Sequence, residues 1–237
     1  MLKISELKTK FGNFELSLEE LKIKKGSLIL LMGPNGSGKS TMLKSLAGLI
    51  SYSGKVLVDD KKVESLSYKD RAKTFAYLPQ RVSVSEMLVR DFVLTGRFPY
   101  TRILSGYSEK DVQMVQEVSL IFGIQDYLDR DISALSQGEF QRVLLAKVFV
   151  QNPNILLLDE PTTSLDMGYK HSVKEQILNY KQSNKDAVII ISTHEPELFK
   201  DLANGFIMLK KGRVFKKAEA GTYDDNDLKG LFDLKFC

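Results

Sequence analysis

Gly33-Pro34-Asn35-Gly36-Ser37-Gly38-Lys39-Ser40-Thr41 follows directly on the apolar residues 28–32, and this junction decides the fold. The stretch matches the pattern G-x-x-x-x-G-K-[ST] in full. Five consecutive apolar residues predict a buried central strand, and residues 40–49 predict a helix. A glycine-rich turn between a buried strand and a helix is the backbone arrangement that holds polyphosphates. The sequence therefore predicts a phosphate-binding loop rather than a turn without function.

The residue types in this loop explain the chemistry that it would carry. Gly33, Gly36 and Gly38 let backbone N–H groups approach an anion without interference from a Cβ atom. We expect the Lys39 ammonium to reach the β- and γ-phosphates, and the Ser40 hydroxyl to bind Mg²⁺. The loop therefore predicts a nucleoside triphosphate with its magnesium ion.

A second apolar run, residues 155–158, ends in two acids, Asp159 and Glu160. A buried strand can hold Asp159 at its tip, close to the magnesium ion. Glu160, one residue later, is in the right place to accept a proton from the attacking water. A strand that merely ends in a polar turn is the alternative, and the phosphate loop makes it the weaker one.

The order of predicted elements indicates an α/β fold. Buried strands are expected at residues 27–32, 74–78, 154–158 and 187–192, with a helix at 169–182. Residues 2–8 and 14–23 predict antiparallel strands, and residues 205–209 and 213–215 predict a hairpin. Residues 85–131 show helical periodicity. We expect one domain over 1–237, with an α/β core at 1–84 and 146–215, a helical part at 85–145, and a tail at 216–237.

Composition excludes several classes of protein. The 237 residues carry a net charge of +4, and 43% of them are hydrophobic, as in ordinary globular proteins. The charge is too small and too evenly spread to predict a nucleic-acid partner. The single cysteine, Cys237, excludes an intrachain disulfide. No apolar run is long enough to span a bilayer, and the N-terminus shows no signal-peptide pattern.

Leu135-Ser136-Gln137-Gly138-Glu139-Phe140-Gln141-Arg142 stands between the two apolar runs and resembles the signature of ATP-binding cassette (ABC) ATPases. Further stretches resemble other motifs of this family, in the family's order: Tyr77-Leu78-Pro79-Gln80, Ser164-Leu165-Asp166 and Ser192-Thr193-His194. The resemblance implies a P-loop NTPase (RecA-like) core with an N-terminal antiparallel β subdomain and an inserted α-helical subdomain.

The resemblance also implies the site residues. Those implied for ATP binding are Phe11, Gly33, Pro34, Asn35, Gly36, Ser37, Gly38, Lys39, Ser40, Thr41, Gln80, Ser136, Gln137, Gly138, Glu139, Asp159, Asp166 and His194. Catalytic roles fall to Lys39, Gln80, Glu160 and His194, and metal binding to Ser40, Gln80 and Asp159. Phe11 would stack on the adenine, and His194 would bind the γ-phosphate.

A further implication is a homodimer that forms when ATP binds. Ser136 and Gly138 would face a nucleotide held by the other copy, and Ser136 is also a good helix N-cap. Three positions depart from the family pattern: Gln137 replaces a glycine, Lys147 replaces an arginine, and Glu195 stands where an aspartate is common. None of these changes affects Lys39, Asp159 or Glu160.

The layout resembles the free-standing cassettes of prokaryotic importers. Residues 91–100 resemble a Gly-Arg-x-Pro-His/Tyr stretch of cassettes that energise uptake of iron–siderophore complexes, haem and vitamin B12. This resemblance implies membrane permease subunits that contact residues 81–105, an indirect substrate-binding protein, and a place on the cytoplasmic face of the membrane. Three alternatives remain: an importer subunit for an unrelated substrate, an ABC ATPase that acts on a soluble partner, and a P-loop kinase.

Overall fold

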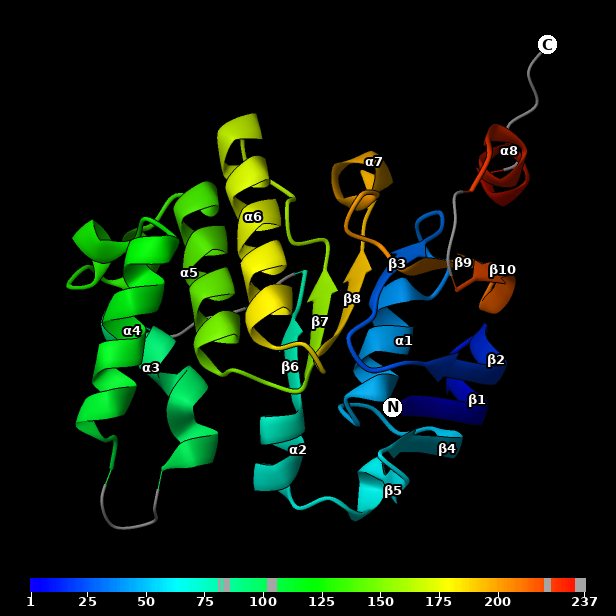
Figure 1. Ribbon diagram of the computed structural model, residues 1–237, viewed down its shortest axis with the longest axis horizontal. Coiled ribbons are helices and arrows are strands. Elements are labelled where there is room, and N and C mark those ends of the chain that lie inside the picture. Colours follow the sequence, from blue (N-terminus) through cyan, green and yellow to red (C-terminus); the bar gives the residue numbers. More distant parts are fainter. Residues whose placement is uncertain (81, 83–85, 102–105, 220–222, 233–237) are drawn as a thin grey trace.

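The predicted strand at residues 28–32 lies inside a large mixed sheet, as the computed structural model shows (Figure 1). The structure describes residues 1–80, 82, 86–101, 106–219 and 223–232. Across them the strand order is β5-β4-β1-β2-β10-β9-β3-β8-β7-β6. The predicted surface at 81–105 and the predicted tail at 216–237 are thus described only in part, and Cys237 lies outside the described residues.

Five neighbouring strands run parallel. They are β9 (Gly205–Lys210), β3 (Leu28–Met32), β8 (Val188–Ser192), β7 (Ile155–Asp159) and β6 (Phe75–Leu78). Leu28 and Leu30 of β3 face one hydrophobic core, and Ile29 and Leu31 face another. Such strands are buried on both faces, which explains their unbroken apolar sequences. Their carboxyl ends meet at one edge of the sheet, where ligands bind in α/β folds.

The other half of the sheet is mainly antiparallel. It contains β1 (Leu2–Phe11), β2 (Phe14–Ile23), β4 (Ser53–Val58) and the short β5 (Lys61–Lys62). Strand β10 (Arg213–Ala218) pairs antiparallel with β9 and meets β2 at the Arg213–Ser17 pair. The predicted hairpin at 205–215 therefore joins the two halves.

Helices cover both faces of the parallel strands. Those next to the sheet are α1 (Lys39–Leu46), α2 (Tyr68–Thr74), α6 (Met167–Ser183) and α7 (Pro196–Phe199). The helical part contains α3 (Val89–Leu94), a 3-10 helix (Thr95–Tyr100), α4 (Glu109–Ile121) and α5 (Gln137–Val150), gathered at one end of the molecule (Figure 1). Short 3-10 turns span Val63–Ser65, Gln125–Tyr127 and Ile132–Ala134. Helix α8 (Asp225–Phe232) lies in the tail, as the leucine spacing there indicates.

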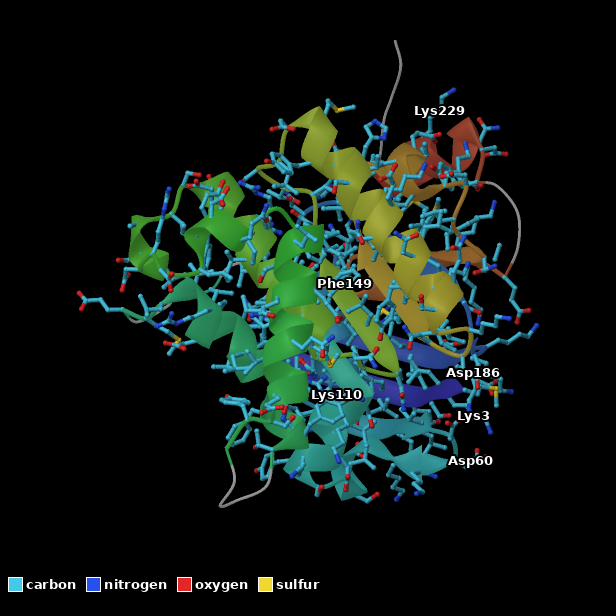
Figure 2. All side chains as sticks on the ribbon, turned by 60° about the vertical axis from the view of Figure 1, so that its left-hand side comes forward. Lys3, Asp60, Lys110, Phe149, Asp186 and Lys229 are labelled. Atoms are coloured by element: carbon cyan, nitrogen blue, oxygen red, sulfur yellow. The ribbon has the colours of Figure 1, made fainter. Side chains whose placement is uncertain are left out.

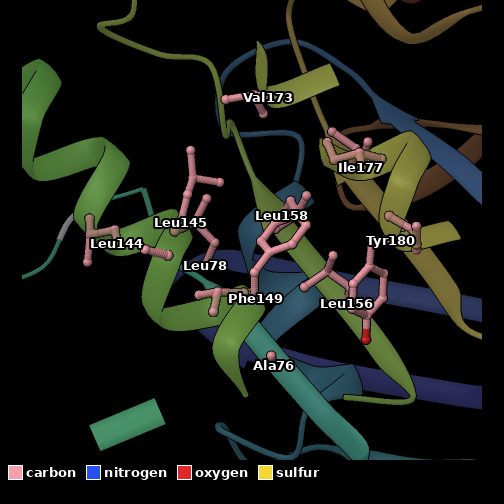
Figure 3. Packing of buried hydrophobic residues seen from close by; sticks show 14 of the residues in the cluster. Ala76, Leu78, Leu144, Leu145, Phe149, Leu156, Leu158, Val173, Ile177 and Tyr180 are labelled. Carbon is pink, nitrogen blue, oxygen red and sulfur yellow. The ribbon is translucent and has the colours of Figure 1, made fainter. Parts of the chain in front are cut away.

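Helix α5 connects the helical part to the parallel strands. Its Phe149 packs edge-on against Phe122 and Tyr180, and Figure 3 shows it beside Leu156 and Leu158 of β7. In Figure 2 Phe149 lies within the body of the molecule, whereas labelled charged residues such as Lys3 and Lys229 lie at its outside. The predicted boundary between residues 145 and 146 falls inside this one helix.

The observed architecture confirms the predicted fold class, a P-loop core that carries an antiparallel β part and a helical part. Among the described residues, no helix has the length and apolar composition needed to cross a bilayer.

Candidate active site

The phosphate loop joins β3 to α1 and takes a backbone path that requires glycine. Gly33 has a φ of 155°, and a Cβ atom there would lie 2.3 Å from the carbonyl oxygen of Leu209. Gly38 has a φ of 106°, and its Cβ atom would lie 2.9 Å from the ring of Phe14. Only glycine fits at these two positions without strain. The two glycines let the loop fold back over the start of α1.

The first turn of α1 is left without a side-chain cap. Its N-cap is Gly38, and no acidic residue stands in the first turn. The first N–H groups of a helix have no partner within the helix and carry the positive end of its dipole. An anion is therefore the natural partner for this helix end, as the sequence predicted.

Lys39 is held inside the loop. Its Nζ donates to the carbonyl oxygen of Gly33 at 2.8 Å, and the residue is only 6% exposed. Burial lowers the pKa of Lys39 below its usual value, although the nearby Glu160 and Asp159 carboxylates act in the opposite direction. A cation held in place by carbonyl oxygens can exchange them for phosphate oxygens with little rearrangement.

The loop borders a hollow of about 480 Å³ that suits a small charged molecule. Its described lining residues are Phe14, Asn35, Gly36, Ser37, Gly38, Lys39, Ser40, Thr41, Gln80 and Glu160. The Ser37 hydroxyl is buried, and no protein partner satisfies it among the described residues. Gly33 and Pro34 lie at the start of the same loop.

Asp159 lies at the tip of β7 and is 1% exposed. Ser192 Oγ, at the tip of β8, donates to Asp159 Oδ1 at 2.5 Å, and the Tyr77 hydroxyl donates to Oδ2 at 3.1 Å. Burial and the Asp159 carboxylate raise the pKa of Tyr77. These two neutral donors fix the orientation of the carboxylate.

Glu160 has an unusual backbone conformation. Its φ of 53° lies in the left-handed region, which non-glycine residues rarely adopt. The Glu160 N–H is held by the carbonyl oxygen of Ser192 at 3.0 Å and by its hydroxyl at 3.1 Å. The tip of β8 therefore stabilises the turn that presents the Glu160 side chain at the sheet edge.

Gln80 and His194 contact the two carboxylate oxygens of Glu160. Gln80 Nε2 donates to Glu160 Oε2 at 2.8 Å, and His194 Nε2 lies 2.9 Å from Oε1. The three residues come from the ends of β6, β7 and β8, which are adjacent in the sheet. The structure thus brings three of the four predicted catalytic side chains together beside the phosphate loop, which carries the fourth, Lys39.

Magnesium fits the donors at this edge. Ser40 offers a hydroxyl, Gln80 an amide oxygen and Asp159 a buried carboxylate, and oxygen ligands of this kind suit Mg²⁺. Among the described residues, no cluster of three or more His, Cys, Asp or Glu residues could hold a metal by itself. Since Mg²⁺ is usually held by one or two carboxylates together with substrate phosphates, these donors suit a metal that arrives with a phosphate ligand.

The signature stretch lies at the start of α5, away from the lining of this hollow. Ser136 caps the helix, since its hydroxyl accepts from the Glu139 N–H at 3.4 Å and Glu139 Oε2 accepts from the Ser136 N–H at 2.8 Å. Gln137 is exposed, and a Cβ atom added at Gly138 would lie 3.5 Å from the Ser164 carbonyl oxygen. Within one chain, the structure does not bring these residues to the phosphate loop.

Asp166 and Phe11 also lie outside the described lining of the hollow. Asp166 caps α6 by accepting from the Tyr169 N–H at 3.0 Å. Phe11, at the β1–β2 turn, is 51% exposed and pairs across the hairpin with Phe14, which does line the hollow.

Sequence reasoning missed three residues of this site: Phe14, Tyr77 and Ser192. The signal for Ser192 was a hydroxyl at the end of an otherwise apolar strand next to Asp159. Tyr77 and Phe14 gave no signal of their own, because an aromatic residue in a strand is usually a core residue.

Comparison with known proteins identifies the family. The family profile described as "ABC transporter" matches residues 17–163. The chain belongs to the ABC transporter family. It is 35% identical to the iron(3+)-hydroxamate import ATP-binding protein of Bacillus subtilis, over 90% of this chain and 80% of that protein.

Solved structures of ABC cassettes have the same fold. A metal-chelate type ABC transporter in an inward-facing conformation matches with a TM-score of 0.81 and 26% identity, over 98% of this chain and 89% of that one. A dimeric cassette in a post-hydrolysis state, bound to ADP and phosphate, matches with a TM-score of 0.81 and 25% identity, over 94% of this chain and all of that one. This chain is an ABC ATPase that binds ATP, which excludes the P-loop kinase.

Proposed function

We propose that this chain is the ATP-hydrolysing subunit of an importer for metal chelates, such as iron–siderophore complexes, haem or cobalamin. It works as a homodimer on the cytoplasmic face of the membrane, where it binds separate permease subunits that receive cargo from a substrate-binding protein. The likeness to a hydroxamate importer subunit and to a metal-chelate transporter supports this substrate class. The observation that carries the proposal is the platform formed by the Thr95–Tyr100 turn, which exposes Phe98 and Tyr100.

Buried contacts hold this platform in place, and it carries an apolar tip. The Arg97 side chain is buried, pairs with Asp111 at 2.8 Å and donates to the carbonyl oxygen of Val150 at 2.8 Å. Tyr100 stacks on the Arg97 guanidinium, with its ring centre 4.0 Å away. Phe98, between them, is 70% exposed. A fixed turn with an exposed aromatic residue suits contact with another protein.

Hydrolysis follows from the arrangement of the sheet edge. Lys39 and the loop N–H groups bind the β- and γ-phosphates, and Ser136 and Gly138 of the partner subunit cover the same nucleotide from the other side. Phe11, at the β1–β2 turn, stacks on the adenine. When the γ-phosphate arrives, His194 and Gln80 transfer their hydrogen bonds from Glu160 to the nucleotide side. ATP closes the dimer because it binds the closed form more tightly than the open one.

The freed Glu160 carboxylate accepts a proton from the attacking water. The water oxygen bonds to the γ-phosphorus while the bond to the ADP oxygen breaks, and ADP leaves with that oxygen. Mg²⁺, held by Ser40, Gln80 and Asp159, would neutralise charge on the phosphates. The Lys39 ammonium and His194 stabilise the rest of that charge in fixed positions.

Assembly with the permease tests the proposal. Co-expressed with its permease, the wild-type chain should co-purify with it in detergent, and a ferric chelate with its binding protein should stimulate ATP hydrolysis in vesicles. Phe98→Asp should abolish co-purification while the isolated subunit keeps its basal ATPase activity. Leu120→Asp is the matched control, because Leu120 on α4 is 69% exposed and lies outside the platform.

Two outcomes would contradict the proposal. If the chain binds a soluble protein instead of a permease, a non-transport ABC ATPase is the better interpretation of its function. If the permease complex responds to a different class of cargo and not to metal chelates, the substrate assignment is wrong and the importer assignment stands.

A further inference from the structure

Glu195, directly after His194, makes contacts that the nucleotide chemistry does not explain. Its Oε1 pairs with Lys170 Nζ at 2.5 Å, and its Oε2 accepts from Thr162 Oγ1 at 3.2 Å. The Glu195 N–H donates to Thr193 Oγ1 at 2.9 Å. The residue next to His194 is thus fixed by both its backbone and its side chain.

These contacts join three parts of the chain that are separate in sequence. Thr162 is 3% exposed and lies two residues after Glu160. Lys170 belongs to the first turns of α6, and its side chain is only 18% exposed. Glu195 therefore ties the loop that carries His194 to α6 and to the segment that carries Glu160.

The orientation of the His194 side chain depends on this loop. Its Nε2 lies 2.9 Å from Glu160 Oε1, and the side chain is 39% exposed. On the other side of the loop, the Thr193 N–H donates to the carbonyl oxygen of Leu31 in β3 at 3.3 Å. The Lys170–Glu195 ion pair is thus the anchor that holds the exposed side of the loop toward α6.

We propose that Lys170 and Glu195 are positioning residues for ATP hydrolysis. Their ion pair holds the 193–195 loop so that His194 faces Glu160 and the incoming γ-phosphate, and neither residue takes part in the chemistry itself. This inference rests on the proposed role of His194.

The size of the effect follows from geometry rather than from stability. A partly exposed ion pair contributes little to the free energy of unfolding. A displacement of about 1 Å in a catalytic group can cost about 100-fold in rate. Because Thr193 and Thr162 still hold the loop, we expect loss of the ion pair to lower kcat by about tenfold, less than that limit.

The test compares Lys170→Met with Lys174→Met in the full chain. Lys174, one turn later on α6, pairs with Asp201 at 2.7 Å and does not contact the 193–195 loop in any described interaction. Lys170→Met should lower kcat about tenfold with KM for ATP unchanged. Lys174→Met should leave both parameters at wild-type values, and Lys170→Arg should restore most of the activity.

A double-mutant cycle with His194→Ala identifies the route of the effect. If Lys170 acts through His194, then Lys170→Met causes no further loss in the His194→Ala background. A further tenfold loss there would overturn the inference, and so would wild-type kcat in Lys170→Met or an equal loss in Lys174→Met. Wild-type kcat in His194→Ala would instead overturn the proposed role of His194 itself.

Discussion

The phosphate loop and the signature stretch each run into the start of a helix. The two helix N-termini differ in whether their backbone N–H groups are capped within the chain. Helix α1 begins at Gly38 with no side-chain cap and no acid in its first turn, beside the buried Lys39. Helix α5 begins at Ser136 with a complete capping box from Glu139. The first end needs an anion, whereas the second is already satisfied within its own chain. In the proposed dimer, a nucleotide held at the α1 end of one chain is covered by the α5 end of the other, so one chain should bind ATP alone and hydrolyse it only as a pair.

Glu160→Gln should have the largest effect on turnover, because it removes the proton acceptor. It leaves both helix ends intact. We expect turnover to fall by about 10²- to 10⁴-fold, the usual contribution of a general base. ATP affinity should persist, so the variant should accumulate as an ATP-bound dimer in size-exclusion chromatography. The control is Glu175→Gln, an exposed position on α6. Wild-type phosphate release by Glu160→Gln would remove Glu160 from its role.

Lys39→Ala damages only the α1 end. Its ammonium is a buried cation that exchanges carbonyl oxygens for phosphates, so its loss should weaken ATP binding by about 100-fold or more. Equilibrium binding of a fluorescent ATP analogue measures this effect. Lys44→Ala, at the opposite end of the same helix, should bind normally. Unchanged affinity in Lys39→Ala would contradict the assignment of the phosphate loop.

Gly138→Asp damages only the α5 end. An added Cβ atom would lie 3.5 Å from the Ser164 carbonyl oxygen, an ordinary van der Waals contact, and an acid in the first turn favours the helix, so the chain should fold. Binding of ATP by a single chain should be unchanged. Turnover should fall by at least about 30-fold, because the new carboxylate repels the nucleotide held by the partner subunit.

A mixing experiment sharpens the same point. Each composite site contains Lys39 of one chain and Gly138 of the other. A dimer of one Lys39→Ala chain and one Gly138→Asp chain therefore keeps one undamaged composite site. Mixing the two inactive variants should therefore restore measurable turnover. The absence of any recovery, with dimers present, would contradict the shared-site arrangement.

The parts of the site also differ in how well the sequence predicted their positions. The phosphate loop, Asp159 and Glu160 were predictable because one buried strand ends at each, and the edges of parallel strands meet. The fold was predictable for the same reason, since strands buried on both faces leave unbroken apolar runs. The contacts of Glu195 with Lys170 and Thr162 were not predictable, because they depend on how α6 packs beside the 193–195 loop. Tyr77 was missed because nothing in the sequence shows that its hydroxyl reaches Asp159.

Ser136→Ala should have the smallest effect and decides whether Ser136 is more than a helix cap. Ser108 provides the comparison, since it caps α4 with its own capping box through Asp111. Loss of either cap should cost about 1 kcal/mol of stability, or roughly 2–4 °C in Tm for a chain of this size.

Only Ser136→Ala should also slow ATP turnover, by about threefold to tenfold, because one hydrogen bond to the partner subunit's nucleotide is lost. Measurements of Tm and kcat on both variants separate the two roles. If Ser136→Ala and Ser108→Ala lose stability equally and both keep wild-type turnover, Ser136 acts only as a cap. The signature end would then contribute to the composite site through its backbone and Gly138, and the contrast between the two helix ends would rest on backbone groups alone.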